Sequence, residues 1–266
     1  MTGPAPAKIN LALVVGPLRA DGKHELATVY QRVDLGDRIA VEPSVETTVE
    51  GFDDTIVLAA LDLLEAPHGW RVRIEKQTPV AAGLGGGSSD AATALRLANA
   101  QLEEPLAPEE LHALAAQVGA DVPFFLFDGP QLGTGDGTTL EPLDLPQDFA
   151  VLLVLPDGAV KHSTKAVYDA FDARGGADGF DGRCAALRDA LAAVRRPRDL
   201  AALPPNDLAR SPLTVALLAS GAFRADVSGA GPAVYGLFHS TAEAQHAAHA
   251  LRKVGRTWVT VPAWYG

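Results

Sequence analysis

The stretch PVAAGLGGGSSD at residues 79–90 places glycines at positions 83, 85, 86 and 87, directly before a segment with helical spacing. Glycine has no Cβ and tolerates positive φ, so its backbone can approach an anion closely. Successive N–H groups can then converge on the anion, and the dipole of the following helix adds positive charge at its N-terminus. The stretch therefore predicts a triphosphate-binding loop. A flexible loop with a serine N-cap at the helix start near Ser88 is the alternative.

The details of this loop exclude more common nucleotide-binding motifs. It lacks the Lys-Ser/Thr ending of a P-loop, and no window in the chain satisfies G-x-G-x-x-G. The chain also has no G-x-S-x-G nucleophile elbow and no H-E-x-x-H metal motif. The sequence therefore argues against two common nucleotide-binding folds. It also argues against the serine hydrolases of the elbow type and the zincin metalloproteases.

Composition narrows the classes of partner. The chain has 266 residues, 47% of them hydrophobic, and carries 22 Lys and Arg against 33 Asp and Glu, a net charge of −11. A protein this acidic is a poor candidate for non-specific binding to nucleic acid or to an anionic membrane. The one cysteine, Cys184, excludes an intrachain disulfide and a cysteine metal cluster, and we interpret it as a small buried residue. The apolar run at residues 11–18 is too short to span a bilayer, so we expect a soluble, cytoplasmic protein.

Strand and helix patterns alternate along the chain and restart after a proline-containing segment at residues 142–149. We expect strands at residues 9–15, 38–42, 70–75, 124–127, 149–155, 233–238 and 256–261. We expect helices at residues 56–64, 91–102, 108–118, 164–171, 184–194, 212–220 and 242–254, and a flexible loop at 175–182. This spacing predicts an α+β sandwich.

Two charged residues are candidates for chemistry. Alternation in the first strand puts four apolar side chains on one face (Ile9, Leu11, Leu13 and Val15) and Lys8, Asn10 and Ala12 on the other. Lys8 is a compact cation that could stabilise developing negative charge, or a strand-edge lysine that discourages aggregation. Asp121 lies in the segment GADVP and could accept a proton, hold Lys8 by charge pairing, or simply form a turn.

Three segments resemble, in order, the signatures of the GHMP small-molecule kinases. Residues 79–92 resemble the second signature, residues 6–11 (PAKINL) the N-terminal one, and residues 227–232 (VSGAGP) the C-terminal glycine motif. The resemblance spans nearly the whole chain. It implies a two-domain α+β fold, with an N-terminal lobe like domain 2 of ribosomal protein S5 at residues 1–146 and a ferredoxin-like α/β sandwich lobe at residues 147–266. ATP and substrate would occupy the cleft between the lobes.

Within the superfamily, three details are similar to the members that phosphorylate 4-diphosphocytidyl-2-C-methyl-D-erythritol in the non-mevalonate isoprenoid pathway. They are residues 7–11 (AKINL), the turn at 19–26 (RADGKHEL) and residues 119–123 (GADVP). The resemblance implies transfer of the ATP γ-phosphate to the 2-hydroxyl of that substrate, with Mg²⁺. The alternatives are a kinase for homoserine, mevalonate or a sugar, against which the turn and residues 119–123 argue, and a non-catalytic nucleotide sensor. Retention of both Lys8 and Asp121 argues against the sensor.

The resemblance also assigns roles to individual residues. Lys8 and Asp121 would be the catalytic pair, with Asp121 either a base or an electrostatic organiser. The substrate-binding residues would be Asn10 and Thr164 at the methylerythritol, His24 at the cytosine edge, and Tyr168 packed on the cytosine. The ATP-binding loop would comprise Pro79, Val80, Ala81, Ala82, Gly83, Leu84, Gly85, Gly86, Gly87, Ser88 and Ser89.

The chain departs from the family pattern at one position of the turn. It has Gly22-Lys23-His24 where the family normally has Gly-Tyr-His, whose tyrosine stacks on the cytosine. A lysine cannot reproduce that stacking, although its ammonium can approach a diphosphate or sit over a base. The sequence singles out no protein ligand for Mg²⁺ beyond the hydroxyls of Ser88 and Ser89. Asp90 would complement the N-terminus of the following helix.

Overall fold

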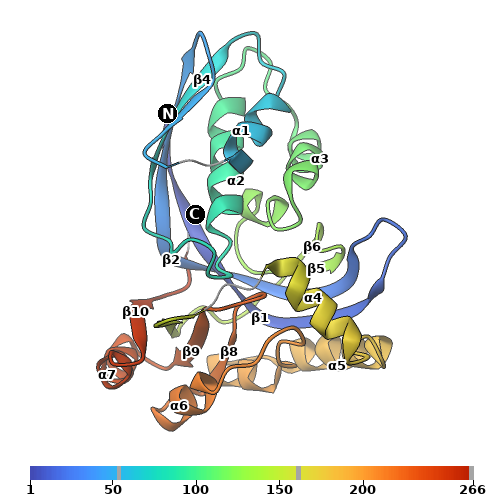
Figure 1. Ribbon diagram of the computed structural model, residues 1–266, viewed down its shortest axis with the longest axis vertical. Coiled ribbons are helices and arrows are strands. Elements are labelled where there is room, and N and C mark those ends of the chain that lie inside the picture. Colours follow the sequence, from blue (N-terminus) through green and yellow to red (C-terminus); the bar gives the residue numbers. More distant parts are fainter. Residues whose placement is uncertain (53–54, 160–162, 264–266) are drawn as a thin grey trace.

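The computed structural model describes residues 1–52, 55–159 and 163–263, which form two β-sheets with helices packed against both (Figure 1). The first sheet contains β1 (Thr2–Leu18), β2 (His24–Ser44), β3 (Thr48–Glu50), β4 (Gly69–Glu75), β5 (Gln131–Gly135) and β6 (Thr139–Pro142). Its strand order is β3-β4-β2-β5-β6, with β1 also paired to β2. Only the β3–β4 pair is parallel among the strand pairs of the described chain.

The second sheet has the order β10-β7-β9-β8 and is antiparallel throughout. Its strands are β7 (Ala150–Pro156), β8 (Arg224–Val227), β9 (Val234–Phe238) and β10 (Gly255–Thr260). One face packs against α6 (Leu213–Ala219) and α7 (Thr241–Leu251). The other face packs against β1 and β2, so that residues of both sheets share one hydrophobic core.

The remaining helices lie on or beside the first sheet. They are α1 (Thr55–Asp62), α2 (Gly86–Asn99), α3 (Pro108–Val118), α4 (Thr164–Ala173) and α5 (Phe180–Ala193), with short 3-10 helices η1 (Pro123–Leu126) and η2 (Pro197–Ala202). Figure 1 shows α1, α2 and α3 stacked on one side of the first sheet, and their apolar faces form a core with it. No helix among the described residues is long and apolar enough to cross a bilayer.

The structure confirms the predicted helices apart from shifts of a few residues at their ends, and six of the predicted strands. The strand predicted at residues 124–127 is wrong, because this segment forms η1. Pro123 begins the 3-10 turn, and the apolar character of Phe124 and Phe125 reflects burial against the helical layer rather than pairing in a sheet. The loop predicted at 175–182 ends earlier than expected, since α5 begins at Phe180.

A β-bulge in β1 overturns the predicted alternation. Asn10 pairs with Tyr30 but Ala12 pairs with Val29, so Leu11 is an extra residue in the ladder. A one-residue slip moves every later side chain to the opposite face. Ile9 and Leu11 therefore lie in the core shared with the second sheet, whereas Leu13 and Val15 pack in a separate cluster with Leu26, Phe171 and Leu208.

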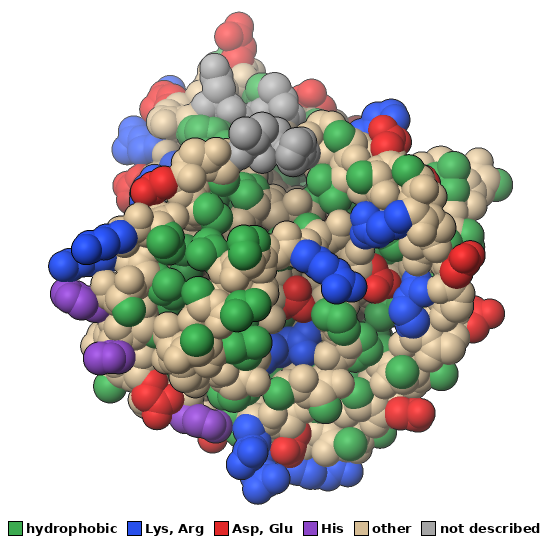
Figure 2. All heavy atoms as spheres, turned by 60° about the horizontal axis from the view of Figure 1, so that its bottom comes forward, with side chains coloured by type: hydrophobic (Ala, Val, Ile, Leu, Met, Phe, Trp, Pro, Cys, Tyr) green, Lys and Arg blue, Asp and Glu red, His purple; other side chains and the backbone are tan. Residues whose placement is uncertain are grey.

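Surface charge is mixed on the face in Figure 2. Lys and Arg side chains are interspersed with Asp and Glu both at its edge and near its centre, and hydrophobic side chains lie between them.

Candidate active site

A cavity of about 760 Å³ brings together ten of the residues singled out in the sequence. Its lining comes from β1, β2, the loop before α2, the first turn of α2, α4 and the glycines near residue 230. The predicted residues that line it are Lys8, Asn10, His24, Ala81, Gly83, Gly85, Ser88, Asp121, Thr164 and Tyr168. Three segments far apart in sequence therefore meet at one cavity.

Lys8 and Asp121 face each other in this cavity. Lys8 Nζ lies 3.4 Å from Asp121 Oδ2, and the lysine side chain is only 4% exposed whereas the aspartate is 34% exposed. The Tyr30 hydroxyl donates a hydrogen bond of 3.0 Å to the other oxygen, Asp121 Oδ1. One carboxylate oxygen is therefore held by the protein, while the other faces a buried ammonium at the edge of the cavity.

A relay of hydrogen bonds fixes the ammonium. Lys8 Nζ donates to Asn10 Oδ1 at 2.6 Å, and Asn10 Nδ2 donates to Thr28 Oγ1 at 2.8 Å. The Thr28 hydroxyl donates in turn to the carbonyl of Ala12 at 2.8 Å. Because the amide nitrogen of Asn10 is committed to Thr28, its oxygen points at Lys8.

Sequence reasoning missed Tyr30 and Thr28, which lie opposite the catalytic segment on β2. The predicted strand covered only residues 38–42, whereas β2 begins at His24. The signal that would have found them is the run of β-branched and aromatic residues in ATVYQRV at 27–33. Burial, and to a smaller extent the charge of Asp121, raises the pKa of Tyr30 well above its usual range. The Tyr30 hydroxyl therefore remains protonated and donates to Asp121.

The glycine-rich loop is shaped by contacts with the other two signature segments. Gly83 and Gly85 have φ of +83° and +68°, and a Cβ on Gly83 would lie 2.3 Å from the Ser228 carbonyl oxygen. The Ser228 hydroxyl donates to the Gly83 carbonyl at 2.8 Å, and the Lys8 amide donates to the Leu84 carbonyl at 2.9 Å. Glycine is therefore required here by both conformation and close approach.

The helix after the loop begins at Gly86, earlier than expected. Its N-cap is Gly85, with no side-chain cap among the described residues, so the alternative of a serine N-cap is wrong. Ser88 lines the cavity on the first turn of α2, whereas Ser89 is fully buried. Ala82 and Leu84 are also buried, in the core shared by the two sheets.

The other loop residues lie at the edge of this arrangement. Pro79, Gly86 and Gly87 are partly buried, and Val80 is exposed. Because none of these four lines the cavity, their predicted role in binding ATP stays a prediction.

Asp90 points into the protein rather than into the cavity. Its Oδ2 accepts a hydrogen bond of 2.6 Å from Lys76 Nζ, which also donates to Asp37 Oδ2 at 2.8 Å, and both carboxylates are fully buried. Burial raises the pKa of Asp90 to about 8 against the opposing effect of Lys76. Asp37 also accepts from the amides of Gln77 and Thr78, so this ion-pair cluster ties the end of β4 to the start of α2.

The far side of the cavity carries the predicted base-binding residues. His24 stacks on Tyr168 with ring centroids 4.7 Å apart, and Phe171 meets the histidine edge-on. His24 Nε2 lies 2.9 Å from Asp172 Oδ1 on α4. Burial, and to a smaller extent the charge of Asp121, raises the pKa of Tyr168 to about 12. Three side chains from α4 thus contact His24, and two of them, Tyr168 and Asp172, also line the cavity.

Lys23 has a partner that the sequence did not indicate. Its Nζ lies 2.5 Å from Asp136 Oδ2, which joins the β1–β2 turn to the β5–β6 turn. Burial alone would raise the pKa of Asp136, but hydrogen bonds from Lys23 and Thr138 lower this pKa to about 2. The lysine that replaces the family tyrosine is therefore tied down by an ion pair at the cavity.

Comparisons with known proteins identify the family of the chain. The family models "GHMP kinases N terminal domain" and "GHMP kinases C terminal" match residues 54–129 and 214–257. The 4-diphosphocytidyl-2-C-methyl-D-erythritol kinase of Anaeromyxobacter dehalogenans (strain 2CP-C) is 40% identical, covering 93% of this chain and 84% of its own length. The kinase of the same name from Desulfitobacterium hafniense (strain Y51) is 37% identical, covering 96% and 93%.

Solved structures give the same result. A crystal structure of 4-(cytidine 5'-diphospho)-2C-methyl-D-erythritol kinase superposes with a TM-score of 0.77 at 34% identity, covering 99% of this chain and 100% of that one. The mevalonate kinase of Methanococcus jannaschii, with a TM-score of 0.75 and 14% identity over 99% and 98% of the two chains, shares the fold alone. The α+β GHMP kinase fold expected from the motifs is confirmed. The chain belongs to the GHMP kinases and, within them, to the family of 4-diphosphocytidyl-2-C-methyl-D-erythritol kinases.

Proposed function

We propose that this ATP-dependent kinase transfers the γ-phosphate of ATP to the 2-hydroxyl of 4-diphosphocytidyl-2-C-methyl-D-erythritol, a step of the non-mevalonate route to isoprenoid precursors. The observation that carries the proposal is the pair of Lys8 and Asp121, 3.4 Å apart, in the cavity where the three signature segments meet. A protein that only binds nucleotide has no need of a buried ammonium facing a half-exposed carboxylate.

In the proposed reaction the substrate hydroxyl lies between these two side chains. Its oxygen forms a bond to the γ-phosphorus as the bond from that phosphorus to the β–γ bridging oxygen breaks, and ADP leaves. Asp121 Oδ2 receives the hydroxyl proton, since Oδ1 is already held by Tyr30. The Lys8 ammonium stabilises the negative charge that develops on the oxygens of the transferred phosphoryl group.

The phosphates of ATP would bind at the loop and the first turn of α2. Buried Ala82, Leu84 and Ser89 can contribute only through their backbone, whereas the Ser88 hydroxyl lines the cavity. Mg²⁺ at triphosphates keeps several waters and takes few protein ligands, which are carboxylates or, as in P-loops, a Ser or Thr hydroxyl. The Ser88 hydroxyl fits that need, although no group of three acidic, His or Cys ligands occurs in the described part of the chain. When bound, Mg²⁺ would neutralise phosphate charge during transfer.

Substrate recognition would divide between the two ends of the cavity. His24 and Tyr168 would hold the cytosine, because their stacked rings offer an aromatic surface next to a hydrogen-bonding edge. Asn10 and Thr164 would contact the methylerythritol near Lys8. Asn10 can do so while holding Lys8, since its amide keeps one further donor and one further acceptor position.

An ADP-release assay tests the proposal. The purified protein would be given ATP, Mg²⁺ and, in turn, the cytidyl substrate, homoserine, mevalonate and galactose. We expect ADP only with the cytidyl substrate. ADP with another alcohol would identify a different GHMP kinase, and ADP with none of them would favour the nucleotide sensor.

A further inference from the structure

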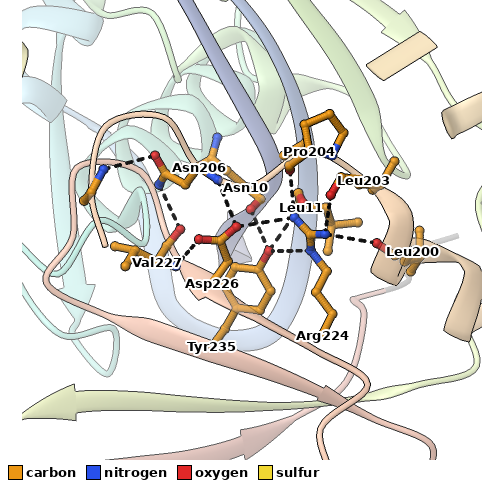
Figure 3. A network of polar contacts seen from close by, with 12 residues as sticks. Asn10, Leu11, Leu200, Leu203, Pro204, Asn206, Arg224, Asp226, Val227 and Tyr235 are labelled. Carbon is orange, nitrogen blue, oxygen red and sulfur yellow. Dashed lines mark hydrogen bonds and ion pairs between the residues drawn. The ribbon is translucent and has the colours of Figure 1, made fainter. Parts of the chain in front are cut away.

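A buried polar network connects the second sheet to the catalytic strand, as Figure 3 shows. Tyr235 of β9 is fully buried, and its hydroxyl donates to the carbonyl of Asn10 at 3.0 Å and reaches that of Leu11 at 3.4 Å. Asn10 is the residue whose side chain holds Lys8. A side chain of one sheet therefore contacts the backbone of the other sheet, two residues along the chain from the proposed catalytic lysine.

The two carbonyls belong to the bulge in β1. The bulge is the place where the β1–β2 ladder loses its regular pairing, between Asn10 and Ala12. A buried backbone carbonyl without a partner costs free energy comparable to a lost hydrogen bond. The Tyr235 hydroxyl supplies a donor at this place, so it stabilises the irregular backbone rather than a regular strand.

Arg224 determines which way the Tyr235 proton points. Its Nε donates to the Tyr235 oxygen at 3.3 Å, which leaves the hydroxyl proton for the bulge carbonyls. The guanidinium is itself held by the carbonyls of Leu200, Leu203 and Pro204 and by the Asp226 carboxylate. Burial raises the pKa of Tyr235 to about 12, so the hydroxyl is protonated at neutral pH.

The same network also holds the glycine turn at Gly229, which lies close to Lys8. Asp226 Oδ2 accepts a hydrogen bond from the backbone N–H of Asn206 at 2.9 Å. The side-chain Nδ2 of Asn206 donates to the Gly229 carbonyl at 2.7 Å. A Cβ on Gly229 would lie 3.5 Å from both Lys8 Nζ and Asn10 Oδ1, so the turn packs against this pair. The network thus contacts the catalytic segment at two separate points.

We propose that Tyr235 is a positioning residue for phosphoryl transfer: its hydroxyl holds the bulge at Asn10 and Leu11, and thereby aims the Asn10 amide that orients Lys8. The inference rests on the proposed function, because it takes Lys8 as catalytic. A purely structural tyrosine would contribute to stability alone, whereas a positioning tyrosine affects turnover through Asn10.

Tyr235→Phe tests this, since it keeps the ring and removes only the hydroxyl. We expect kcat to fall about tenfold while the KM for ATP stays within twofold, because ATP is bound at the loop and not at the bulge. Phe238→Leu is the matched control: Phe238 lies on the same strand but faces the core under α6 and α7. Both variants should lower the melting temperature, and only Tyr235→Phe should lower kcat.

A double-mutant cycle with Asn10→Ala shows whether Tyr235 acts through Asn10. In the Asn10→Ala background, removal of the Tyr235 hydroxyl should change kcat less than twofold. The inference is overturned if Tyr235→Phe keeps the wild-type kcat, if the two losses multiply in full, or if Phe238→Leu loses as much kcat as Tyr235→Phe. An Asn10→Ala variant with the wild-type kcat would overturn it as well.

A measurement that does not depend on turnover separates this inference from the proposed function. The ¹H–¹⁵N resonances of the Asn10 side-chain amide should shift in Tyr235→Phe and stay in place in Phe238→Leu. If the wild-type protein phosphorylates none of the alcohols, the proposed function fails while this shift still supports the positioning of Asn10. Unshifted Asn10 resonances in Tyr235→Phe overturn the inference whatever the activity.

Discussion

Asp121 differs from an ordinary surface aspartate because each of its oxygens has a defined neighbour. Tyr30 donates to Oδ1, and Lys8 lies 3.4 Å from Oδ2. Tyr30 remains a neutral donor because burial raises its pKa. This arrangement leaves Oδ2 as the oxygen that can meet a substrate proton, and it makes the chemistry of a single side chain testable.

Asp121→Asn should lower kcat by about 10²–10⁴-fold, the range that general acid–base groups contribute. ATP affinity should change little, since the loop that would hold the phosphates is untouched. ADP release and calorimetric titration of ATP measure the two quantities. Asp128→Asn is the control, because Asp128 is 81% exposed, pairs with Arg32 and does not line the cavity. Near-normal turnover of Asp121→Asn would remove this residue from the mechanism.

Lys23 provides a second test at the residue scale. We expect the natural chain to gain less from the cytosine base than Lys23→Tyr does, because a stacked ring is worth about 1–3 kcal/mol per base. The ratio of kcat/KM for the cytidyl substrate and for an analogue that lacks the base measures this. Lys23→Met is the control, since it breaks the ion pair with Asp136 without adding a ring. Equal ratios for Lys23→Tyr and the natural chain would contradict the expectation.

At the scale of elements, structure that depends on local sequence patterns was predicted well, whereas structure that depends on long-range strand pairing was not. The loop before α2 was predicted because its glycines reflect local backbone requirements, at Gly83 and Gly85 above all. The bulge at Leu11 was missed because it depends on pairing with β2 and on the Tyr235 hydroxyl from another sheet. Residues 124–127 were assigned to a strand because a short apolar run does not distinguish a strand from a buried 3-10 turn, which the structure places at Pro123–Leu126.

The same limit applies to the site. Lys8, Asp121 and the loop were identified from motifs within single segments, whereas Tyr30 acts from a neighbouring strand that the pattern did not reveal. Asp90 was assigned to the helix N-terminus, but its partner Lys76 comes from the end of β4. Which side chain meets which is decided by the packing of elements, and no local pattern carries that information.

The ion-pair cluster under α2 predicts how stability depends on pH. The pKa of Asp90 is near 3.8 in the unfolded chain and about 8 in the folded one, so between these values the folded state binds more protons. The free energy of unfolding should therefore fall as pH rises from about 4 to 8, and level off above that. Asp90→Asn cannot ionise and should flatten this slope.

Urea unfolding at pH 5, 6.5 and 8 measures the effect of Asp90. Asp62→Asn, at an exposed position of α1, is the control and should keep the wild-type slope. An Asp90→Asn variant with the same slope as the wild type would show that Asp90 ionises no differently in the two states.

At the scale of the whole molecule, the two sheets share one hydrophobic core. Ile9 and Leu11 of β1 pack in the same cluster as Val151 and Leu153 of β7. The predicted division of the chain at residues 146 and 147 stays a prediction about sequence organisation. A shared core of this kind predicts that neither sheet unfolds without the other, because separation would expose apolar surface on both.

Tryptophans in different sheets allow this to be measured. Trp70 is buried on β4, and Trp258 lies on β10 beside the shared core. Variants that keep only one of these tryptophans should unfold in urea at the same midpoint. Leu153→Ala should lower the free energy of unfolding by about 2–5 kcal/mol, the usual range for a buried leucine. It should move both midpoints equally, because the cavity that it creates lies in a core that belongs to both sheets; a shift of the Trp258 midpoint alone would mean that the sheets are independent units.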